Sequence, residues 1–301
     1  MKFIDEATIA SVLSLPELIP VMKNALIEFS TGQIRQPTRQ IIDVPAHGGF
    51  FGAMPAASAG ALGAKLVSAY PNNGAKGLPT HLAVIVMFRP QTGEPLLAMD
   101  GRLITEWRTA AVTAAFIDAV AAPDVRSLAI LGAGLQGHTH IEALRHIRRF
   151  SDLRVWNRTS ERAEQLAAEY GGRQLSAEEA VRDADVVVVA TASTEPVLDG
   201  RWLKPGAKVA SVGWSGKDGA ELDAWTMAHT VIVDSRAGTQ TESGNVRRYS
   251  PVIRGELGEL LAGAVSVGPD ETVVLDSIGM ACEDVAAAAL VCDKLAARGM
   301  L

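Results

Sequence analysis

Three glycines with the spacing G-x-G-x-x-G stand in the segment LGAGLQG, which begins at Leu131 and follows an apolar run at 127–130. In a turn from a strand into a helix, Gly132 permits a tight bend and Gly134 lets the backbone approach a pyrophosphate. Gly137 lets the helix pack close to the strand, and the amino end of that helix faces the anion. A glycine-rich turn without a ligand is the alternative, but the second strand expected beyond it favours a dinucleotide site.

The end of that second strand indicates which dinucleotide would bind. Sites for NAD usually place a carboxylate there for the ribose 2′-hydroxyl, whereas this chain has Asn157, Arg158 and Thr159. A guanidinium and a hydroxyl suit a 2′-phosphate. NADPH is therefore the predicted cofactor, with NADH as the second choice; a solvated loop cation is the alternative interpretation of Arg158.

A nicotinamide needs a partner that exchanges hydride, so other residues must hold an anionic substrate and manage a proton. Candidate groups gather before residue 120, in the segments 36–39, 63–67, 77–81 and 104–111. A planar guanidinium such as that of Arg39 grips a carboxylate with two hydrogen bonds. Taken on residue type alone, however, the strand lysine Lys65 and the helix arginine Arg108 are better explained as surface residues.

The elements that would position these groups fall into two patterns. From residue 128 onward, short β-branched runs at 128–131, 153–156, 186–190, 208–212 and 231–233 alternate with helical stretches. This alternation predicts a parallel sheet covered by helices. Within it, Ser176-Ala177-Glu178-Glu179 has the form of a capping box that begins a helix.

The first 120 residues instead predict a mixed α+β domain. We expect a helix over 17–29, strands at 41–44, 50–54, 64–68, 83–88 and 96–99, and a helix over 106–121 that leads into the sheet domain. The last helix, 282–297, is rich in alanine and valine and needs a partner surface. The fold class expected is α/β, with a Rossmann domain at 123–277 inserted in a substrate and dimerisation domain at 1–122 and 278–301.

Composition limits the classes of function. The chain has 301 residues, 48% hydrophobic and 21% charged, with a formal charge of -6 and no block of lysine or arginine, so nucleic acid is not an expected partner. Neither a signal peptide nor a spanning run is evident, and we expect no membrane association and a cytoplasmic location. Cys282 and Cys292 are interpreted as thiols rather than redox or zinc ligands. His138, Glu142 and His146 have a spacing that could bind metal, but a solvated helix face is preferred and no metal is predicted.

The whole chain resembles the ornithine cyclodeaminase/mu-crystallin family, and within it most closely the ketimine reductase branch. The segments that match the family pattern in order are 49–56, 65–67, 99–101, 108–112, 131–136, 155–159, 242–246, 256–259 and 277–288. The resemblance implies a homodimer in which the terminal segments form the substrate and dimerisation domain around a Rossmann domain.

The same resemblance implies roles for individual residues. Arg39 would bind the substrate carboxylate, Lys65 would contact the substrate or move a proton, and Arg108 would lie beside both cofactor and substrate. The predicted cofactor contacts are Thr80, Arg108, Gly132, Gly134, Leu135, Gln136, Asn157, Arg158, Thr159, Thr191 and Gly279.

One departure from the family bears on the reaction. Cyclodeaminases of the family carry an acid at the position occupied here by Ser215, and a serine at its ordinary pKa cannot act as the general base of deamination and ring closure. Ser215 is kept as a catalytic candidate that orients water or an amine. His81 is a further candidate for proton delivery, with a structural histidine as the alternative.

The predicted activity is therefore reduction of a C=N bond next to a carboxylate. Small cyclic ketimines such as Δ1-pyrroline-2-carboxylate or Δ1-piperideine-2-carboxylate would give proline or pipecolate. The alternatives are an alanine-dehydrogenase-like amino acid dehydrogenase, an ornithine cyclodeaminase, or a protein that binds NADPH or another small ligand without turnover.

Overall fold

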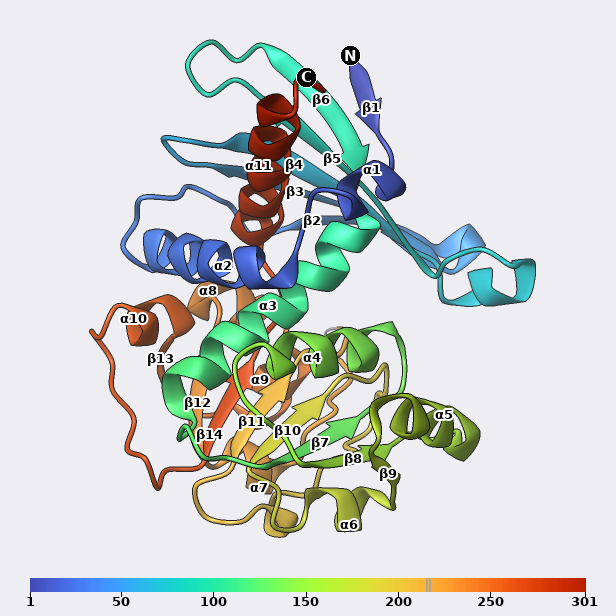
Figure 1. The fold of residues 1–301 in the computed structure, drawn as a ribbon, viewed down its shortest axis with the longest axis vertical. Helices are drawn as coiled ribbons and strands as arrows, with labels where there is room; N and C mark the ends of the chain where they lie inside the picture. The colour runs from blue at the N-terminus through green and yellow to red at the C-terminus, as the bar shows by residue number, and fades with distance from the viewer. Residues whose placement is uncertain (215, 217) are drawn as a thin grey trace. The chain divides into compact units, whose positions relative to one another are not determined.

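The computed structural model describes residues 1–214, 216 and 218–301, and the candidate Ser215 lies outside the described residues. The chain divides into two compact units (Figure 1). Unit 1 comprises Met1–Arg108 and Met280–Leu301, and unit 2 comprises Thr109–Gly279. The boundary between the two units therefore falls within helix α3 (Arg102–Val120). The sequence predicted this boundary just after the helix.

Unit 1 contains a six-stranded sheet in the order β1-β6-β5-β4-β3-β2. The pairs from β2 to β6 are antiparallel, and β1 joins β6 in parallel. The strands are β1 (Lys2–Ile4), β2 (Gln40–Val44), β3 (Gly49–Ala57), β4 (Leu62–Ala69), β5 (His81–Phe88) and β6 (Pro95–Asp100). The helices are α1 (Glu6–Ala10), α2 (Leu15–Ser30) and α11 (Ala281–Ala297), with 3-10 turns at Pro45–His47 and Pro71–Lys76.

Helix α11 packs on β3, β4 and β5 and also against α2. Successive side chains of a strand point to opposite faces of the sheet. On β4, Gly63, Lys65 and Val67 are buried while the residues between them are half-buried. A Cβ placed on Gly63 would lie 3.4 Å from Val285 of α11, so Lys65 stands on the face of the sheet that α11 covers.

Unit 2 contains an eight-stranded sheet whose strands pair in parallel, in the order β13-β12-β14-β11-β10-β7-β8-β9. Its strands are β7 (Ser127–Leu131), β8 (Asp152–Trp156), β9 (Arg173–Gln174), β10 (Val186–Val189), β11 (Lys208–Ser211), β12 (Thr230–Val233), β13 (Ile253–Glu256) and β14 (Val273–Asp276). Its further helices are α4 (Leu135–Arg145), α5 (Ser160–Tyr170), α6 (Ala177–Val181), α7 (Ala224–Met227), α8 (Arg236–Glu242), α9 (Gly244–Tyr249) and α10 (Leu257–Leu261), with a 3-10 turn at Gly200–Trp202.

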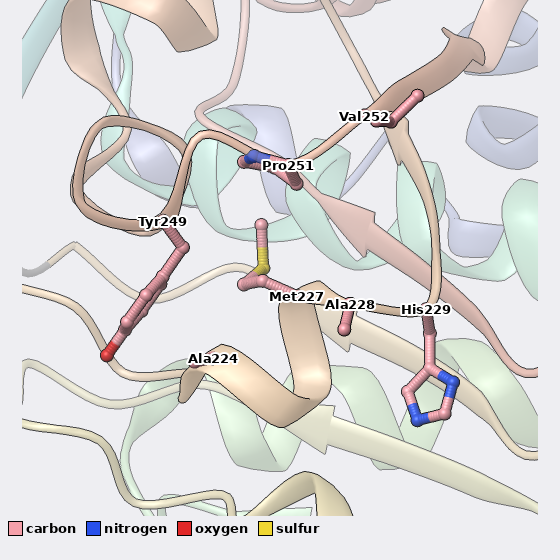
Figure 2. A pocket seen from close by; sticks show the side chains of 7 residues that line it. All are labelled: Ala224, Met227, Ala228, His229, Tyr249, Pro251 and Val252. Carbon is pink, nitrogen blue, oxygen red and sulfur yellow. The ribbon is translucent and has the colours of Figure 1, made fainter.

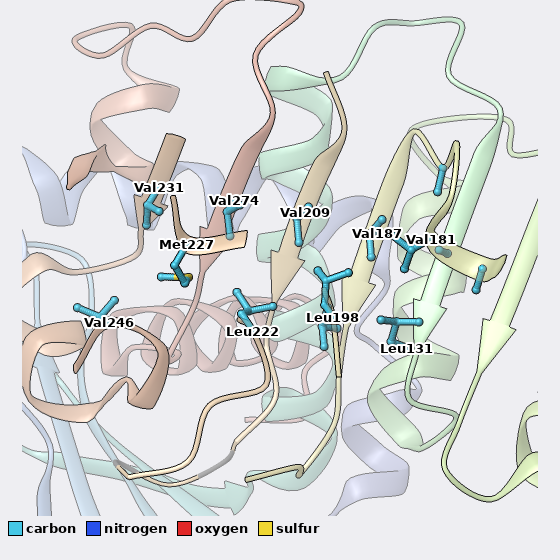
Figure 3. Packing of buried hydrophobic residues seen from close by; sticks show 14 of the residues in the cluster. Leu131, Val181, Val187, Leu198, Val209, Leu222, Met227, Val231, Val246 and Val274 are labelled. Atoms are coloured by element: carbon cyan, nitrogen blue, oxygen red, sulfur yellow. The ribbon is translucent and has the colours of Figure 1, made fainter. Parts of the chain in front are cut away.

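The central strands of unit 2 are apolar on both faces, as a sheet covered on both sides requires. All four valines of β10 are buried, and one side of this core gathers Leu131, Val209, Val231 and Val274 from neighbouring strands (Figure 3). The expected α/β fold class with a parallel sheet is confirmed. None of the helices in the described ranges combines the length and apolar character needed to cross a bilayer.

Some elements differ from those expected. Helix α3 begins at Arg102 rather than 106, because the Asp100 carboxylate accepts a hydrogen bond of 2.8 Å from the Arg102 N–H. Strand β14 was not predicted from the sequence, and it lies between β11 and β12 in the sheet. The capping box is present, since the Glu179 N–H donates to Ser176 Oγ at 3.3 Å.

Candidate functional site

The glycine-rich loop joins β7 to α4 with the geometry expected of each glycine. Gly132 has a φ of +119°, and a Cβ there would lie 2.3 Å from the carbonyl oxygen of Ala190. A Cβ on Gly137 would lie 2.0 Å from the carbonyl oxygen of Gly132. A Cβ on Gly134, in contrast, would meet no atom of the described chain within 4 Å. The first and third glycines are thus needed for packing, and the second leaves open space.

The amino end of α4 borders that space. Gly134 is the N-cap residue and supplies no side chain to the first N–H groups of the helix, which lack intrahelical acceptors. Leu135 is 65% exposed. The Oε1 atom of Gln136 is buried and has no hydrogen-bond partner among the described residues. Open backbone N–H groups and an unsatisfied amide oxygen suit a pyrophosphate and a polar ligand atom, so this loop fits a dinucleotide.

The loop lies where the strand order of the sheet reverses. β7 pairs with β8 on one side and β10 on the other, so the next βαβ crossover leaves in the opposite direction. Ligands of doubly wound sheets bind at the carboxyl ends of strands at such a point. Figure 2 shows a pocket elsewhere in unit 2, lined by Met227, His229 and Tyr249, beside the amino end of β12. This pocket lies at the amino end of a strand, whereas a nucleotide is expected at the carboxyl ends.

Asn157, which follows β8, forms a hydrogen bond to the glycine-rich loop. Asn157 Oδ1 accepts a hydrogen bond of 3.0 Å from the Ala133 N–H, and its Nδ2 donates to the Thr159 carbonyl at 2.9 Å. The Asn157 side chain thus holds the loop to the end of β8. Arg158 and Thr159 are exposed.

The remaining predicted cofactor contacts occupy three places. Thr191 follows β10, and its hydroxyl donates to the carboxylate of Glu221 at 2.7 Å. The Gly279 N–H donates to Asp234 Oδ2 at 2.8 Å in unit 2. Thr80 is exposed in unit 1, and its carbonyl accepts from the Tyr70 N–H.

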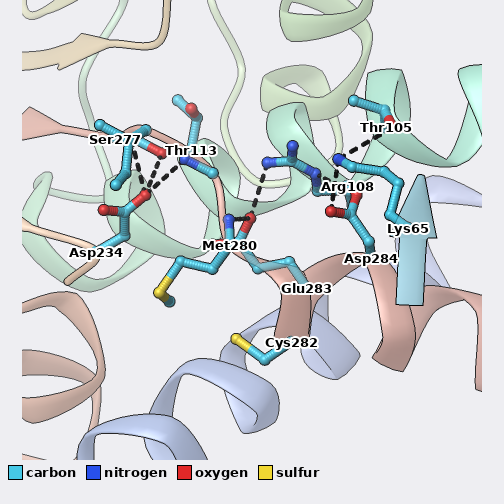
Figure 4. Close-up of polar contacts among 12 residues, drawn as sticks. Lys65, Thr105, Arg108, Thr113, Asp234, Ser277, Met280, Cys282, Glu283 and Asp284 are labelled. Atoms are coloured by element: carbon cyan, nitrogen blue, oxygen red, sulfur yellow. Dashed lines mark hydrogen bonds and ion pairs between the residues drawn. The ribbon is translucent and has the colours of Figure 1, made fainter. Parts of the chain in front are cut away.

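Unit 1 buries two cations against two carboxylates (Figure 4). Lys65 Nζ lies 2.5 Å from Asp284 Oδ2 and 3.5 Å from Thr105 Oγ1. Arg108 donates from Nε to Asp284 Oδ1 at 3.0 Å and from Nη1 to Glu283 Oε2 at 2.8 Å. Both carboxylates are fully buried, and Lys65 is 2% exposed. We call these four residues the charged cluster.

Burial and neighbouring charges alter the pKa values in this cluster. Burial lowers the pKa of Lys65 to about 8, and the charges of Arg108 and Arg39 add to this effect against the attraction of Asp284. Burial opposes ionisation of Asp284, but the charges of Arg108 and Lys65 outweigh it and lower its pKa. Burial raises the pKa of Glu283 despite Arg108. The cluster thus holds a lysine that can lose its proton slightly above neutral pH.

His81 and Arg39 lie near the same cluster. Burial, and then the charge of Lys65, lower the pKa of His81 to about 4. Its imidazole is therefore neutral at pH 7, unlike the ordinary histidine on which its predicted role in proton delivery depended. Arg39 is half-buried, and its charge acts on Lys65. The structure thus brings Arg39, Lys65, His81 and Arg108 into one region of unit 1.

Sequence reasoning did not assign Glu283 and Asp284 to the site. They stand in the first turn of α11, a helix that is otherwise mostly alanine, valine and leucine. Acidic residues are common in first turns, because they favour the positive end of the helix dipole. One feature of the sequence could have identified them. They stand on a helix that was expected to be buried, and a buried carboxylate needs a cation nearby.

Comparisons with known proteins agree over nearly the whole chain. The model of the ornithine cyclodeaminase/mu-crystallin family matches residues 2–299. The ketimine reductase mu-crystallin of Mus musculus is 42% identical over 286 residues, which cover 92% of this chain and 91% of that protein. A Δ1-pyrroline-2-carboxylate/Δ1-piperideine-2-carboxylate reductase of Azospirillum brasilense is 34% identical over 306 residues, which cover 98% of this chain and 96% of that protein.

A solved structure has the same fold. The Δ1-pyrroline-2-carboxylate reductase of Thermococcus litoralis, in complex with NADH and L-proline, superposes with a TM-score of 0.94 at 32% identity. The match covers 99% of this chain and 98% of that one.

Proposed function

Because the chain belongs to the ornithine cyclodeaminase/mu-crystallin family, we propose that it reduces small cyclic imino acids with a nicotinamide nucleotide. The substrates would be Δ1-pyrroline-2-carboxylate or Δ1-piperideine-2-carboxylate, the compounds named for similar reductases. The observation that carries the proposal is the buried pairing of Lys65 and Arg108 with Asp284, which places a proton-bearing cation in a protected site.

The substrate carboxylate would bind between Arg39 and Lys65. The charge of Arg39 lowers the pKa of Lys65, so the two cations repel each other. An anion placed between them would add two attractions that offset this repulsion. A carboxylate fixed in this way would also orient the adjacent C=N bond, which lowers the entropy lost in reaching the transition state.

Lys65 would donate the proton that the reaction consumes. Reduction of the C=N bond forms a C–H bond with hydride and an N–H bond with a proton. With a pKa of about 8, Lys65 is mainly protonated at pH 7, yet it loses a proton more readily than an ordinary lysine. Asp284 would hold the ammonium in place, and the neutral amine would regain a proton from solvent.

Unit 2 would hold the nucleotide, which supplies the hydride when bound. The open space at Gly134 and the amino end of α4 would receive the pyrophosphate. We propose NADPH rather than NADH, because Arg158 and Thr159 are exposed at the end of β8 and the segment 157–160 has no carboxylate for a ribose 2′-hydroxyl.

We further propose that the chain forms a homodimer through the face of the unit 1 sheet opposite α11. In register across the strands, this face carries Ile42, Phe51, Ser68 and Leu82, then Ala53, Leu66 and Val84, then Pro55, Ala64 and Val86. Ile42, Phe51 and Leu82 are exposed to solvent although they are apolar. A broad apolar face of this kind suits a second copy related by a two-fold axis.

Substitution of this face tests the dimer. Ile42→Glu should convert the dimer into monomer at micromolar concentration, because it buries a charge at the interface. Sedimentation equilibrium measures the change, with the exposed Val252→Glu in unit 2 as the matched control. A monomeric wild-type chain, or a dimer that Ile42→Glu leaves intact, would rule out this interface.

The activity is tested by absorbance at 340 nm. The purified chain is mixed with NADPH or NADH and with each cyclic imino acid, pyruvate plus ammonia, or ornithine. We expect loss of absorbance with the cyclic imino acids, and faster loss with NADPH. Release of ammonia from ornithine without net change in nucleotide would identify a cyclodeaminase instead, and nucleotide binding without turnover of any substrate would identify a binding protein.

A further inference from the structure

One buried carboxylate, Glu221, joins the carboxyl ends of two central strands in unit 2. Its Oε2 accepts hydrogen bonds from the N–H and the hydroxyl of Thr191, at 3.1 and 2.7 Å. Its Oε1 accepts from the Ser211 hydroxyl at 2.7 Å and the Gly213 N–H at 2.9 Å. Thr191 follows β10, and Ser211 ends β11. A side chain that is 1% exposed therefore holds both strand ends.

The four donors match the ionised form of this carboxylate. An ionised carboxylate only accepts hydrogen bonds, and each oxygen receives one backbone N–H, a donor that cannot reverse its role. The Ser211 hydroxyl donates to Glu221, and its oxygen accepts a hydrogen bond from Asn245 Nδ2 at 3.1 Å. Asn245 Nδ2 also donates to Asp276 at 2.7 Å, which ties the end of β14 to the same network.

Thr191 is enclosed by backbone on two sides. A Cβ on Gly132 would lie 2.3 Å from the Ala190 carbonyl oxygen and 3.3 Å from Thr191 Cγ2, so the glycine-rich loop packs directly on residues 190 and 191. A Cβ on Gly213 would lie 2.1 Å from the Thr191 carbonyl oxygen. A shift of Thr191 would therefore move the glycine-rich loop or the chain at Gly213.

We propose that Glu221 is a positioning residue of the nucleotide site. Its carboxylate fixes Thr191 and Gly213, and through Thr191 it fixes the glycine-rich loop in the form that receives the pyrophosphate. This inference rests on the proposed function, because it assigns Glu221 to the nucleotide site of that activity. Glu221 acts through the backbone it holds, without a role in the chemical step.

Protonation of Glu221 should weaken this hold. Burial raises the pKa of Glu221 to about 7 against the opposing effect of its hydrogen bonds. The protonated carboxyl has one fewer acceptor site for its four donors. Nucleotide affinity should thus be full above pH 7 and fall as the pH drops through that value. The other ionisable group in the network is Asp276, whose pKa burial also raises.

The test compares Glu221→Gln with wild type by two measurements. Fluorescence titration should show that Glu221→Gln weakens NADPH binding at pH 8 by about tenfold and removes the pH dependence between pH 6 and 8. Hydrogen exchange of the nucleotide-free protein should show faster exchange of the Thr191 or Gly213 amide, since a glutamine has one oxygen for two N–H donors. Glu195→Gln, which changes an exposed glutamate paired with Arg248, is the matched control and should behave as wild type.

A second variant tests the role of Glu221 if Glu221→Gln does not fold. Ser211→Ala removes one donor to Glu221 and should raise the pH at which NADPH affinity falls, because it removes a bond to the ionised form. Wild-type affinity, pH dependence and amide exchange in Glu221→Gln would overturn the proposal, as would an unchanged pH midpoint in Ser211→Ala. A wild-type chain that binds no nucleotide would overturn the proposed function instead, and amide exchange would still show whether Glu221 fixes the strand ends.

Discussion

Unit 1 buries Lys65 and Arg108 against two carboxylates of α11, whereas unit 2 buries Glu221 among four neutral donors. Asp284 and Glu221 differ in the direction of their pKa shifts. Neighbouring cations lower the pKa of Asp284, while burial raises that of Glu221 to about 7. The pairing of Asp284 with two cations favours its ionised form despite burial. Dipoles alone leave a buried group close to titration.

The comparison also separates two tasks. In the charged cluster, Lys65 is the proposed proton donor, and Asp284 would hold it in place. In unit 2, the carboxylate bonds to backbone and fixes the strand ends. Removal of a charge should therefore affect turnover most in unit 1 and nucleotide affinity most in unit 2.

The largest effect is expected from Lys65→Met. It removes the proposed proton donor and one contact to the substrate carboxylate, and kcat/KM for the imino acid should fall by about a thousandfold. NADPH affinity should stay within about twofold of wild type. Steady-state kinetics and fluorescence titration measure the two quantities, with the exposed Lys76→Met as control. A comparable loss of NADPH affinity would show that the two tasks are not separate.

Asp284→Asn should have the next largest effect. It leaves Lys65 and Arg108 with one carboxylate, and breaking a buried ion pair typically costs about 3–5 kcal/mol of unfolding free energy. In wild type, kcat/KM should fall as the pH rises through about 8, the pKa of Lys65, because only the protonated amine donates. Asp284 raises that pKa, so the fall should occur at lower pH in Asp284→Asn.

Urea unfolding and pH profiles of kcat/KM measure these two effects of Asp284→Asn. The exposed Asp293→Asn on the same helix is the control. A pH profile that Asp284→Asn leaves unchanged would show that Lys65 does not set it.

A smaller effect is expected from Arg158→Ala. The variant should weaken NADPH binding by about tenfold and leave NADH binding unchanged, because only NADPH has a phosphate for the guanidinium. Titration with both nucleotides measures the difference, and the exposed Arg162→Ala on α5 is the control. Equal weakening of both nucleotides would assign Arg158 to general electrostatic attraction.

Local patterns were sufficient to predict much of unit 2. The glycine spacing and the alternation of strands and helices placed β7, α4 and β8, and the segment Ser176-Ala177-Glu178-Glu179 identified its helix cap. Strand β14 was missed although its short apolar run resembles those of β10 and β12, which were predicted. Its position between β11 and β12 depends on long connections that no local pattern records.

The charged cluster could be predicted only in part. Arg39, Lys65 and Arg108 were identified by resemblance to a family, but their carboxylate partners were not. Arg108 and Asp284 are 176 positions apart, and their contact depends on the return of α11 to the unit 1 sheet. Glu221 stands in a polar segment, and nothing around it in the sequence indicates burial.

The return of α11 has a consequence for the synthesis of the protein. The carboxylates that neutralise Lys65 and Arg108 stand at least 175 positions after these cations in the chain. The ribosome therefore makes the two cations well before α11, and their charges stay uncompensated until α11 has been synthesised. A truncated chain that stops before α11 would keep both cations solvated and its sheet uncovered. The proposed substrate site can therefore form only after α11 has been synthesised and has packed on the unit 1 sheet.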